Sequence, residues 1–349
     1  MFRIYTSTFI IALSIAYILT PVVQRISISM NWLDKPNYRK INKKPMPLMG
    51  GIAIFLAFLI AIALSMFEEP FANNIDKFVG FLASSFIIVL VGFQDDTKGM
   101  SARRKLTYQI AAALVAANFG FTIIKVSHPL GGAFYAPLLV SMTITVFWIV
   151  GFTNAINLLD GLDGLASGVV AIIAGSLFFA SIKINNPVSA LLSIALAGSS
   201  LGFLRFNFHP AKIFMGDTGS MFMGFALSLI SIEGAYKSST LVTLLIPIIA
   251  MGIPVIDTGL SILRRLTKGN DVFKPDKEHI HHKLLTGGSH REAVLRLYFL
   301  TACFGLIAIS LAGIRGIWVI LALIATGLLA LRWVVNSGFL DFVDEKDSV

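Results

Sequence analysis

The chain has 349 residues, of which 56% are hydrophobic and only 13% are charged, and its mean hydropathy is +0.81. This composition leaves too little polar surface for a soluble globular domain, in which about a quarter of the residues are charged, so it favours a protein embedded in lipid. The single cysteine, Cys303, excludes a disulfide framework and a thiolate metal site.

Apolar runs long enough to cross a bilayer recur along the chain. A hydrocarbon core about 30 Å thick takes roughly 20 helical residues per crossing. Such runs lie approximately at 4–24, 48–66, 78–94, 105–121, 136–153, 164–182, 188–205, 217–235, 240–260, 294–312 and 315–335. The sequence therefore predicts an all-α, polytopic membrane protein of about 11 transmembrane helices. We expect one domain over 1–349 and a retained first helix, because no small-residue cleavage site follows it.

The basic residues are distributed asymmetrically between the two sides of this predicted topology. If the loop at 35–44 is cytoplasmic, 22 of the 28 Lys and Arg residues are cytoplasmic. The six on the other side are Arg3, Lys77, Lys125, Lys183, Lys237 and Arg315. The positive-inside rule then predicts an N-terminus outside and a C-terminus inside. The alternative for the basic loop at 35–44 is a contact with anionic lipid headgroups alone, because every polytopic protein needs a positive-inside bias.

Carboxylates gather beside apolar runs on the same predicted cytoplasmic side. They are Asp95, Asp96, Asp160, Asp163, Asp217 and Asp257. An unpaired charge near hydrocarbon costs on the order of 3 kcal/mol, so such groups normally face a polar cavity with a function. We therefore expect the active site at the cytoplasmic face.

Two adjacent acids, Asp95 and Asp96, end the third run. Neighbouring carboxylates shift each other's titration, so this pair is suited to proton transfer or to holding Mg²⁺. The alternative is a structural loop in which the acids pair with Lys98, Arg103 and Arg104.

The segment from Asn154 to Gly168 carries the most specific pattern. Asn157, Asp160 and Asp163 recur at every third position, with glycines between them. If this stretch is helical, the three side chains project over an arc of roughly 120 degrees, and the glycines let a ligand approach the backbone. An ordinary loop does not require amide and carboxylate groups at every third position, so the pattern indicates a functional site.

Asp217 begins the eighth run, shortly after Phe214. It could be a helix N-cap, with Thr218 and Ser220 satisfying first-turn N–H groups. Helix N-termini also favour phosphate, and a carboxylate there suits Mg²⁺ that shares substrate phosphates.

The long loop near 270–290 contains His279, His281 and His282. Further zinc ligands are not evident from the spacing, so hydrogen-bond donors to phosphate or sugar oxygens fit better. The following segment, Ser289 to Glu292, has the form of a capping box, and we assign no chemistry to His290 within it.

Taken together, these motifs resemble the polyprenyl-phosphate N-acetylhexosamine-1-phosphate transferases, the glycosyltransferase family 4. The resemblance covers almost the whole chain in one order, through Asp34 to Gly51, Asp95-Asp96, Asn154 to Gly164, Phe214 to Asp217 and His279 to His282. It implies that a lipid phosphate attacks the β-phosphorus of a UDP-sugar, releasing UMP. Such phosphoryl transfer depends mainly on positioning and on neutralising charge.

The resemblance also implies roles for individual residues. Asp217 and Asn157 would be metal ligands, with Mg²⁺ as the implied ion and Mn²⁺ as its alternative. Asp95 and Asp96 would be the catalytic pair that handles the lipid phosphate and its proton.

The remaining motif residues would bind the donor. The nucleotide-binding residues would be Asp160, Asp163, Phe214 and Lys44. The histidines His279, His281 and His282 would hold the pyrophosphate or the sugar.

The histidine motif separates two branches of this family. The phospho-MurNAc-pentapeptide transferase branch has a pattern similar to Pro-x-His-His-His, whereas this chain has His279-Ile280-His281-His282. The chain thus resembles the WecA/TagO branch, which implies UDP-GlcNAc as donor, undecaprenyl phosphate as acceptor and the bacterial inner membrane as location. The alternatives are the pentapeptide transferase and, from a different class, a membrane transporter. We expect the bilayer as a partner, no nucleic acid, and a homodimer as an option that the sequence does not decide.

Overall fold

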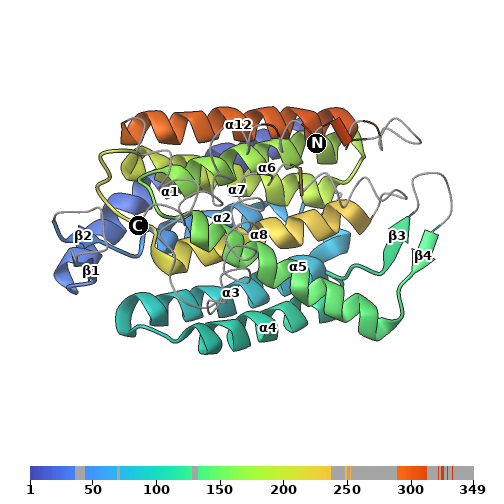
Figure 1. The fold of residues 1–349 in the computed structure, drawn as a ribbon, viewed down its shortest axis with the longest axis horizontal. Coiled ribbons are helices and arrows are strands. Elements are labelled where there is room, and N and C mark those ends of the chain that lie inside the picture. Colours follow the sequence, from blue (N-terminus) through green and yellow to red (C-terminus); the bar gives the residue numbers. More distant parts are fainter. Residues whose placement is uncertain are drawn as a thin grey trace, which may run out of the picture.

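The structure is a computed structural model that describes residues 1–35, 44–68, 71–127, 133–236 and 289–312, with isolated residues between 248 and 332. Long helices run side by side and form one bundle (Figure 1). They are α1 (Phe2–Ser29), α2 (Gly50–Ser65), α3 (Ile75–Lys98), α4 (Ala102–Asn118), α5 (Leu138–Leu159), α6 (Leu165–Lys183), α7 (Pro187–Asn207), α8 (Gly216–Tyr236) and α12 (His290–Leu311). A short 3-10 helix, Ala72–Asn74, precedes α3.

Each of these helices coincides with a predicted apolar run. Within the described ranges, 7 helices are long and apolar enough to cross a membrane. Helix α2 has only 16 residues, and α4, which starts with a run of basic residues, is also outside that set. The runs predicted at 240–260 and 315–335 lie almost wholly outside the described residues, so the total of about 11 crossings stays a prediction.

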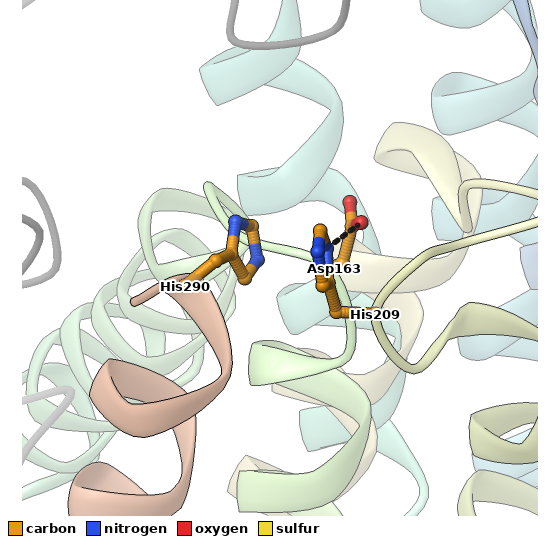
Figure 2. A group of neighbouring side chains, drawn as sticks. All are labelled: Asp163, His209 and His290. Atoms are coloured by element: carbon orange, nitrogen blue, oxygen red, sulfur yellow. Dashed lines mark hydrogen bonds and ion pairs between the residues drawn. The ribbon is translucent and has the colours of Figure 1, made fainter. Parts of the chain in front are cut away.

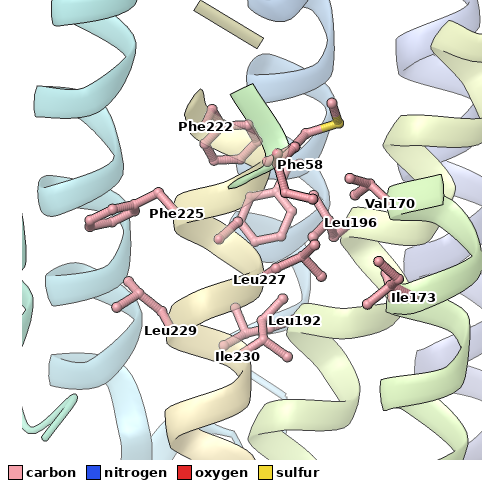
Figure 3. Packing of buried hydrophobic residues seen from close by; sticks show 14 of the residues in the cluster. Phe58, Val170, Ile173, Leu192, Leu196, Phe222, Phe225, Leu227, Leu229 and Ile230 are labelled. Atoms are coloured by element: carbon pink, nitrogen blue, oxygen red, sulfur yellow. The ribbon is translucent and has the colours of Figure 1, made fainter. Parts of the chain in front are cut away.

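Helix α8 lies at the centre of the bundle and is enclosed by other helices, and 89% of the residues in its apolar stretch are buried. Phe58 of α2 packs against Phe222 of α8 with ring centroids 5.6 Å apart (Figure 3). Phe58 also stacks on Phe81 of α3 at a centroid distance of 5.3 Å. A helix that is apolar on all sides is stable only when it is enclosed in this way or faces lipid. The packing therefore makes α8 a rigid support for Asp217 in its first turn.

Two small β-ribbons depart from the all-α prediction. Strands β1 (Leu33–Asp34) and β2 (Met46–Pro47) pair antiparallel, as do β3 (Lys125–Ser127) and β4 (Ala133–Tyr135). The ribbons lie at opposite ends of the bundle (Figure 1). Both ribbons lie in connections between helices, and the described bundle itself is helical as predicted.

The segment before α8 is tied to the segment before α2 through the backbone. Phe214 donates to the carbonyl of Pro47 at 2.8 Å and accepts from the N–H of Gly50 at 2.9 Å, and Gly51 donates to Met215 at 3.0 Å. Helices α3 and α5 end at this same end of the bundle, and helices α4, α6, α8 and α12 begin there. Helix α1 starts at the opposite end and ends here as well. The sequence motifs therefore converge at one end of the molecule.

Candidate active site

A cavity of about 840 Å³ opens at this end of the bundle. Every predicted site residue within the described ranges lines it, namely Lys44, Asp95, Asp96, Asn157, Asp160, Asp163, Phe214 and Asp217. The structure thus brings together residues separated by more than 170 positions in the chain. His279, His281 and His282 lie outside the described residues, so their predicted role is untested.

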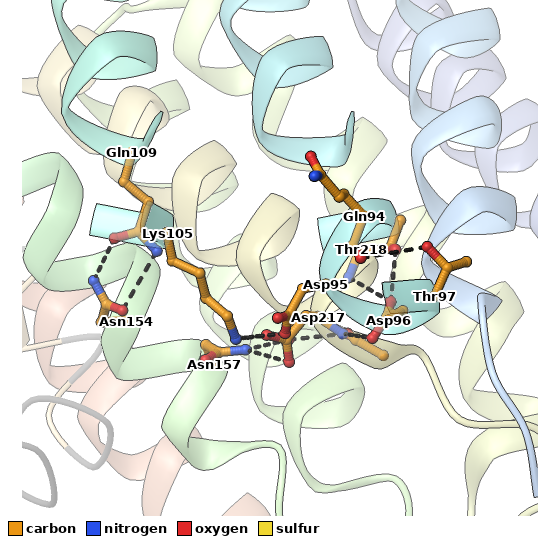
Figure 4. A network of polar contacts seen from close by, with 12 residues as sticks. Gln94, Asp95, Asp96, Thr97, Lys105, Gln109, Asn154, Asn157, Asp217 and Thr218 are labelled. Carbon is orange, nitrogen blue, oxygen red and sulfur yellow. Dashed lines mark hydrogen bonds and ion pairs between the residues drawn. The ribbon is translucent and has the colours of Figure 1, made fainter. Parts of the chain in front are cut away.

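Lys105 of α4 connects two of the acids. Its ammonium group pairs with Asp95 Oδ2 at 2.5 Å and also with Asp217 Oδ2 (Figure 4). All three side chains are largely buried, with exposures of 15% for Asp95, 26% for Asp217 and 23% for Lys105. Ion pairs shielded from water are screened less than surface pairs, so this cluster holds its geometry by charge.

Asn157 completes the surroundings of Asp217. Its side-chain nitrogen donates to Asp217 Oδ1 at 3.1 Å and to the Ser220 hydroxyl at 2.9 Å. Because this amide nitrogen is occupied, the amide oxygen is the Asn157 atom with acceptor capacity for a ligand. Asn157 and Asp217 are therefore adjacent, as the resemblance implied.

Asp96 has a different environment from its neighbour. Its carboxylate accepts hydrogen bonds from the N–H of Asp217 at 2.8 Å, from the N–H of Thr218 at 3.0 Å and from the Thr218 hydroxyl at 2.7 Å. Negative charge at a helix N-terminus is stabilised by the free N–H groups and the helix dipole. The cap of α8 is therefore Asp96 of another helix, and Asp217 is held within the first turn.

The backbones around this cap approach closely because glycines permit it. A Cβ atom added to Gly92 would lie 2.5 Å from Thr218 Cα, and one added to Gly51 would lie 2.1 Å from the Gly219 nitrogen. Gly216, at φ +70°, would direct a side chain into the Asp96 carboxylate, 2.4 Å away. These glycines allow α2 and α3 to reach the start of α8.

The segment from Asn154 to Gly168, considered above as a possible single helix, is helical only in part. Helix α5 ends at Leu159, and α6 starts after Gly164, which adopts φ +78°. Asp160 and Asp163 lie on the glycine-rich turn between them, and both still line the cavity. Loss of hydration, together with the charges of Asp217, Asp96 and Asp163, raises the pKa of Asp160 to about 8.

Lys105 is the site residue that the sequence analysis did not identify, because it entered that analysis only as one of the 22 Lys and Arg residues predicted to be cytoplasmic. The cation beside Asp95 is Lys105, rather than Lys98, Arg103 or Arg104, all of which are exposed. The available signal was the three-residue turn at 99–101, which folds α4 back along α3 and sets a first-turn lysine beside the acids.

The arrangement places carboxylates, an amide and a lysine around one cavity at the end of a bundle of apolar helices, and such groups can hold a cation together with phosphate groups bound to it. The chain matches the family described as Glycosyl transferase family 4 over residues 78–235. It is 39% identical to a Bacillus subtilis protein named as a probable undecaprenyl-phosphate N-acetylglucosaminyl 1-phosphate transferase, over 93% of this chain and 89% of that protein. The chain belongs to glycosyl transferase family 4.

Other relatives carry two further names. A Mycobacterium leprae protein named decaprenyl-phosphate N-acetylglucosaminephosphotransferase is 35% identical, over 81% of this chain and 78% of that protein. A Thermoanaerobacter protein named phospho-N-acetylmuramoyl-pentapeptide-transferase is 31% identical, over 84% and 92%. Because the chain belongs to this family of transferases, the transporter alternative is disfavoured.

Proposed function

We propose that this protein transfers N-acetylglucosamine-1-phosphate from UDP-GlcNAc to undecaprenyl phosphate, releasing UMP. The names of the relatives at 39% and 35% identity support this donor and the polyprenyl acceptor. The pentapeptide transferase is the second candidate, and its lower identity of 31% disfavours it. The histidine motif, which departs from that branch, disfavours it as well.

The observation that carries the proposal is the cluster of Lys105, Asp95 and Asp217 beside Asn157. Two carboxylates already hold one cation there, since the Lys105 ammonium pairs with both. Carboxylate and amide oxygens are the ligands that Mg²⁺ prefers, and it is usually bound through one or two carboxylates plus substrate phosphates. Asp217 and Asn157, with Asp95 adjacent, therefore fit this ion, whereas both oxygens of Asp96 are engaged by α8.

When bound, Mg²⁺ would neutralise charge on the diphosphate of the donor, whose P–O–P bond breaks as the sugar 1-phosphate moves to the lipid phosphate and UMP leaves. The residues of the chain contribute the remaining electrostatics. Lys105 supplies a positive charge, held in place by Asp95, that can stabilise an incoming phosphate. Asp95 also remains the candidate base for the lipid phosphate, although such a phosphate is already largely ionised at neutral pH.

The donor nucleotide would occupy the part of the cavity beside Asp160, Asp163 and Phe214. These residues line one continuous space with Asp217, so a nucleotide diphosphate can extend from the α5–α6 turn to the acidic cluster. Lys44 lines the same cavity from the ribbon side and can approach its phosphates. The acceptor would enter from the bilayer, and the asymmetry of Lys and Arg supports a cytoplasmic opening in the inner membrane.

The test is UMP release by the purified full-length protein in detergent with undecaprenyl phosphate, Mg²⁺ and either UDP-GlcNAc or UDP-MurNAc-pentapeptide. We expect release with UDP-GlcNAc alone, loss of release with EDTA, and loss in Asp217→Ala. Asp76→Ala, which removes an exposed acid in the first turn of α3, is the matched control and keeps full activity. Release with only the pentapeptide donor would establish the second candidate.

A further inference from the structure

A second polar cluster lies on the cavity wall and consists of Asp163, His209 and His290 (Figure 2). The three residues come from the turn after α5, the loop after α7 and the first position of α12. Each offers one ligand-type atom, and these atoms all lie within 4.8 Å of one another. Neither histidine has a role in the proposed transfer, whereas Asp163 would be shared with the proposed nucleotide site.

Asp163 and His209 are already joined. His209 Nδ1 lies 2.8 Å from Asp163 Oδ2, and the same oxygen accepts from the Ala211 backbone N–H at 3.1 Å. A carboxylate that holds an imidazole in this way sets the orientation of the ring. The pair therefore fixes two donor groups at the rim of the cavity before any ligand arrives.

The side chain of His290 has a buried polar atom whose hydrogen-bonding capacity is not satisfied. Its ring stacks on His209, with centroids 4.4 Å apart and 18° between the planes. Its Nε2 is buried and has no hydrogen-bond partner among the described residues. In the confirmed capping box the Ser289 hydroxyl accepts from the Glu292 N–H and the Glu292 carboxylate accepts from the Ser289 N–H, so the box does not involve the His290 ring and does not explain this nitrogen. A buried ring nitrogen without a partner is unusual and indicates that a ligand completes it.

We propose that Asp163, His209 and His290 bind a divalent transition metal ion of the zinc class. Two imidazoles and one carboxylate are a ligand set that Zn²⁺, Co²⁺ and Ni²⁺ accept, whereas Mg²⁺ prefers oxygen ligands alone. Three protein ligands leave a fourth tetrahedral position. Because all three residues line the cavity, that position opens into it.

Formation of this site requires a small local adjustment. Metal–ligand bonds of about 2.0–2.2 Å draw ligand atoms closer together than 4.8 Å. The two stacked rings cannot both direct a nitrogen at one ion, so the His290 ring must turn out of the stack. His290 is the first residue of α12 and is only half-buried, which leaves its side chain room to turn.

An ion bound here would join three separate segments. The turn after α5 is already attached to α7 and α12, since Gly164 accepts from Tyr298 at 2.5 Å and donates to Asn207 at 3.1 Å. The metal would add a further link between these segments. An ion that binds only the folded protein raises its stability, so the thermal unfolding midpoint should rise with Zn²⁺.

The test is a titration of the tag-free, chelator-treated full-length protein with Co²⁺ in the presence of excess Mg²⁺, which fills oxygen-rich sites. Visible d–d absorption reports nitrogen ligation and tetrahedral geometry, and Zn²⁺ should displace the signal. The variants are His290→Ala and His209→Ala. The matched control is the triple variant His279→Ala/His281→Ala/His282→Ala, which removes the other histidine cluster.

We expect one Co²⁺ per chain in the wild type and in the triple variant, with binding weakened about 10-fold or more in each single variant. A midpoint increase with Zn²⁺ should follow the same pattern, and midpoints without metal report whether each variant is folded. Unchanged binding in folded His290→Ala, or loss of binding in the triple variant alone, would overturn the proposal. Because the readout is metal binding, it does not depend on whether the protein transfers sugar phosphate.

Discussion

Asp96 accepts hydrogen bonds from both the backbone N–H and the hydroxyl group of Thr218, at 3.0 and 2.7 Å. Through these bonds α3 caps α8, the central helix of the bundle, and fixes the orientation of its first turn. Asp217 occupies that turn, so Asp96 determines where the Asp217 carboxylate points. Both oxygens of Asp96 accept hydrogen bonds from α8. Asp95, by contrast, pairs with Lys105. Two neighbouring acids therefore have separate tasks.

Asp96→Asn should destabilise the start of α8. The amide has one acceptor oxygen in place of two, and its NH₂ group would face an N–H donor. Hydrogen bonds to charged groups contribute about 1.5–3 kcal/mol each, so the free energy of unfolding should fall by about 2–4 kcal/mol. The measurement is the thermal unfolding midpoint in detergent.

Thr218→Val is the graded control for this change, because it removes only the hydroxyl bond and keeps both backbone bonds. Its midpoint should lie between those of the wild type and Asp96→Asn. Equal midpoints for the wild type and Asp96→Asn would contradict the capping role.

Lys105→Ala should separate turnover from metal affinity. Loss of the positive charge that is proposed to stabilise the incoming phosphate should lower kcat by about 10²–10³-fold, the range for removal of one electrostatic donor. The same change removes a cation that competes for Asp95 and Asp217, so the Mg²⁺ concentration for half-maximal activity should fall. Steady-state rates of UMP release over a Mg²⁺ series measure both quantities.

Arg104→Ala is the matched control for Lys105→Ala, because it removes an equal charge from the preceding, exposed position of α4. Both kinetic quantities should stay at wild-type values in it. An equal loss of turnover in both variants would mean that general positive charge, rather than the ion pairs of Lys105, matters.

Much of the helical scaffold could be predicted from the sequence, because each crossing needs its own apolar run. Helices such as α6 (Leu165–Lys183) and α7 (Pro187–Asn207) therefore follow the predicted ranges 164–182 and 188–205 closely. The gathering of acids at one end could also be predicted, since a charge beside an apolar run requires a polar cavity.

The partners of those acids could not be predicted in the same way. Asp95 and Asp96 are identical in type and adjacent in sequence, and only the rotation of α3 decides which of them meets α8 and which meets Lys105. Likewise, nothing local indicates that His290 would stack on His209, 81 positions earlier. Contacts of this kind depend on how helices pack against one another, and the periodicity of a single helix does not predict that packing.

Gly92→Ala should impair the site without removing any functional group. The added methyl would lie 2.5 Å from Thr218 Cα, so α3 and α8 must separate and the Asp96 cap must loosen. Overpacking of this kind typically costs about 1–3 kcal/mol. We expect a lower unfolding midpoint together with reduced UMP release. Gly151→Ala, where an added Cβ meets nothing within 4 Å, is the control and should be neutral or slightly stabilising.

The carboxyl group of Asp160 should make the stability of the metal-free protein dependent on pH. Its pKa in the folded protein is raised to about 8 by loss of hydration and by the neighbouring acids, whereas an aspartate in the unfolded chain has a pKa of about 3.9. The folded state therefore binds the proton more tightly than the unfolded state between these two values. Stability should fall as pH rises from about 4 to about 8, and the full penalty should be present above pH 8.

Asp160→Asn isolates this contribution, because the amide keeps the size of the carboxyl group and cannot ionise. The measurement is the thermal unfolding midpoint with EDTA at about pH 5, 7 and 9, which roughly covers the range over which the raised pKa of Asp160 takes effect. The variant should lose less stability than the wild type across this series and should be the more stable protein at the highest pH. Parallel pH profiles for the two proteins would show that Asp160 ionises in the folded protein as it does in the unfolded chain. The α5–α6 turn would then be hydrated enough to hold the charge, and the buried cluster of acids would be confined to Asp95, Asp96 and Asp217.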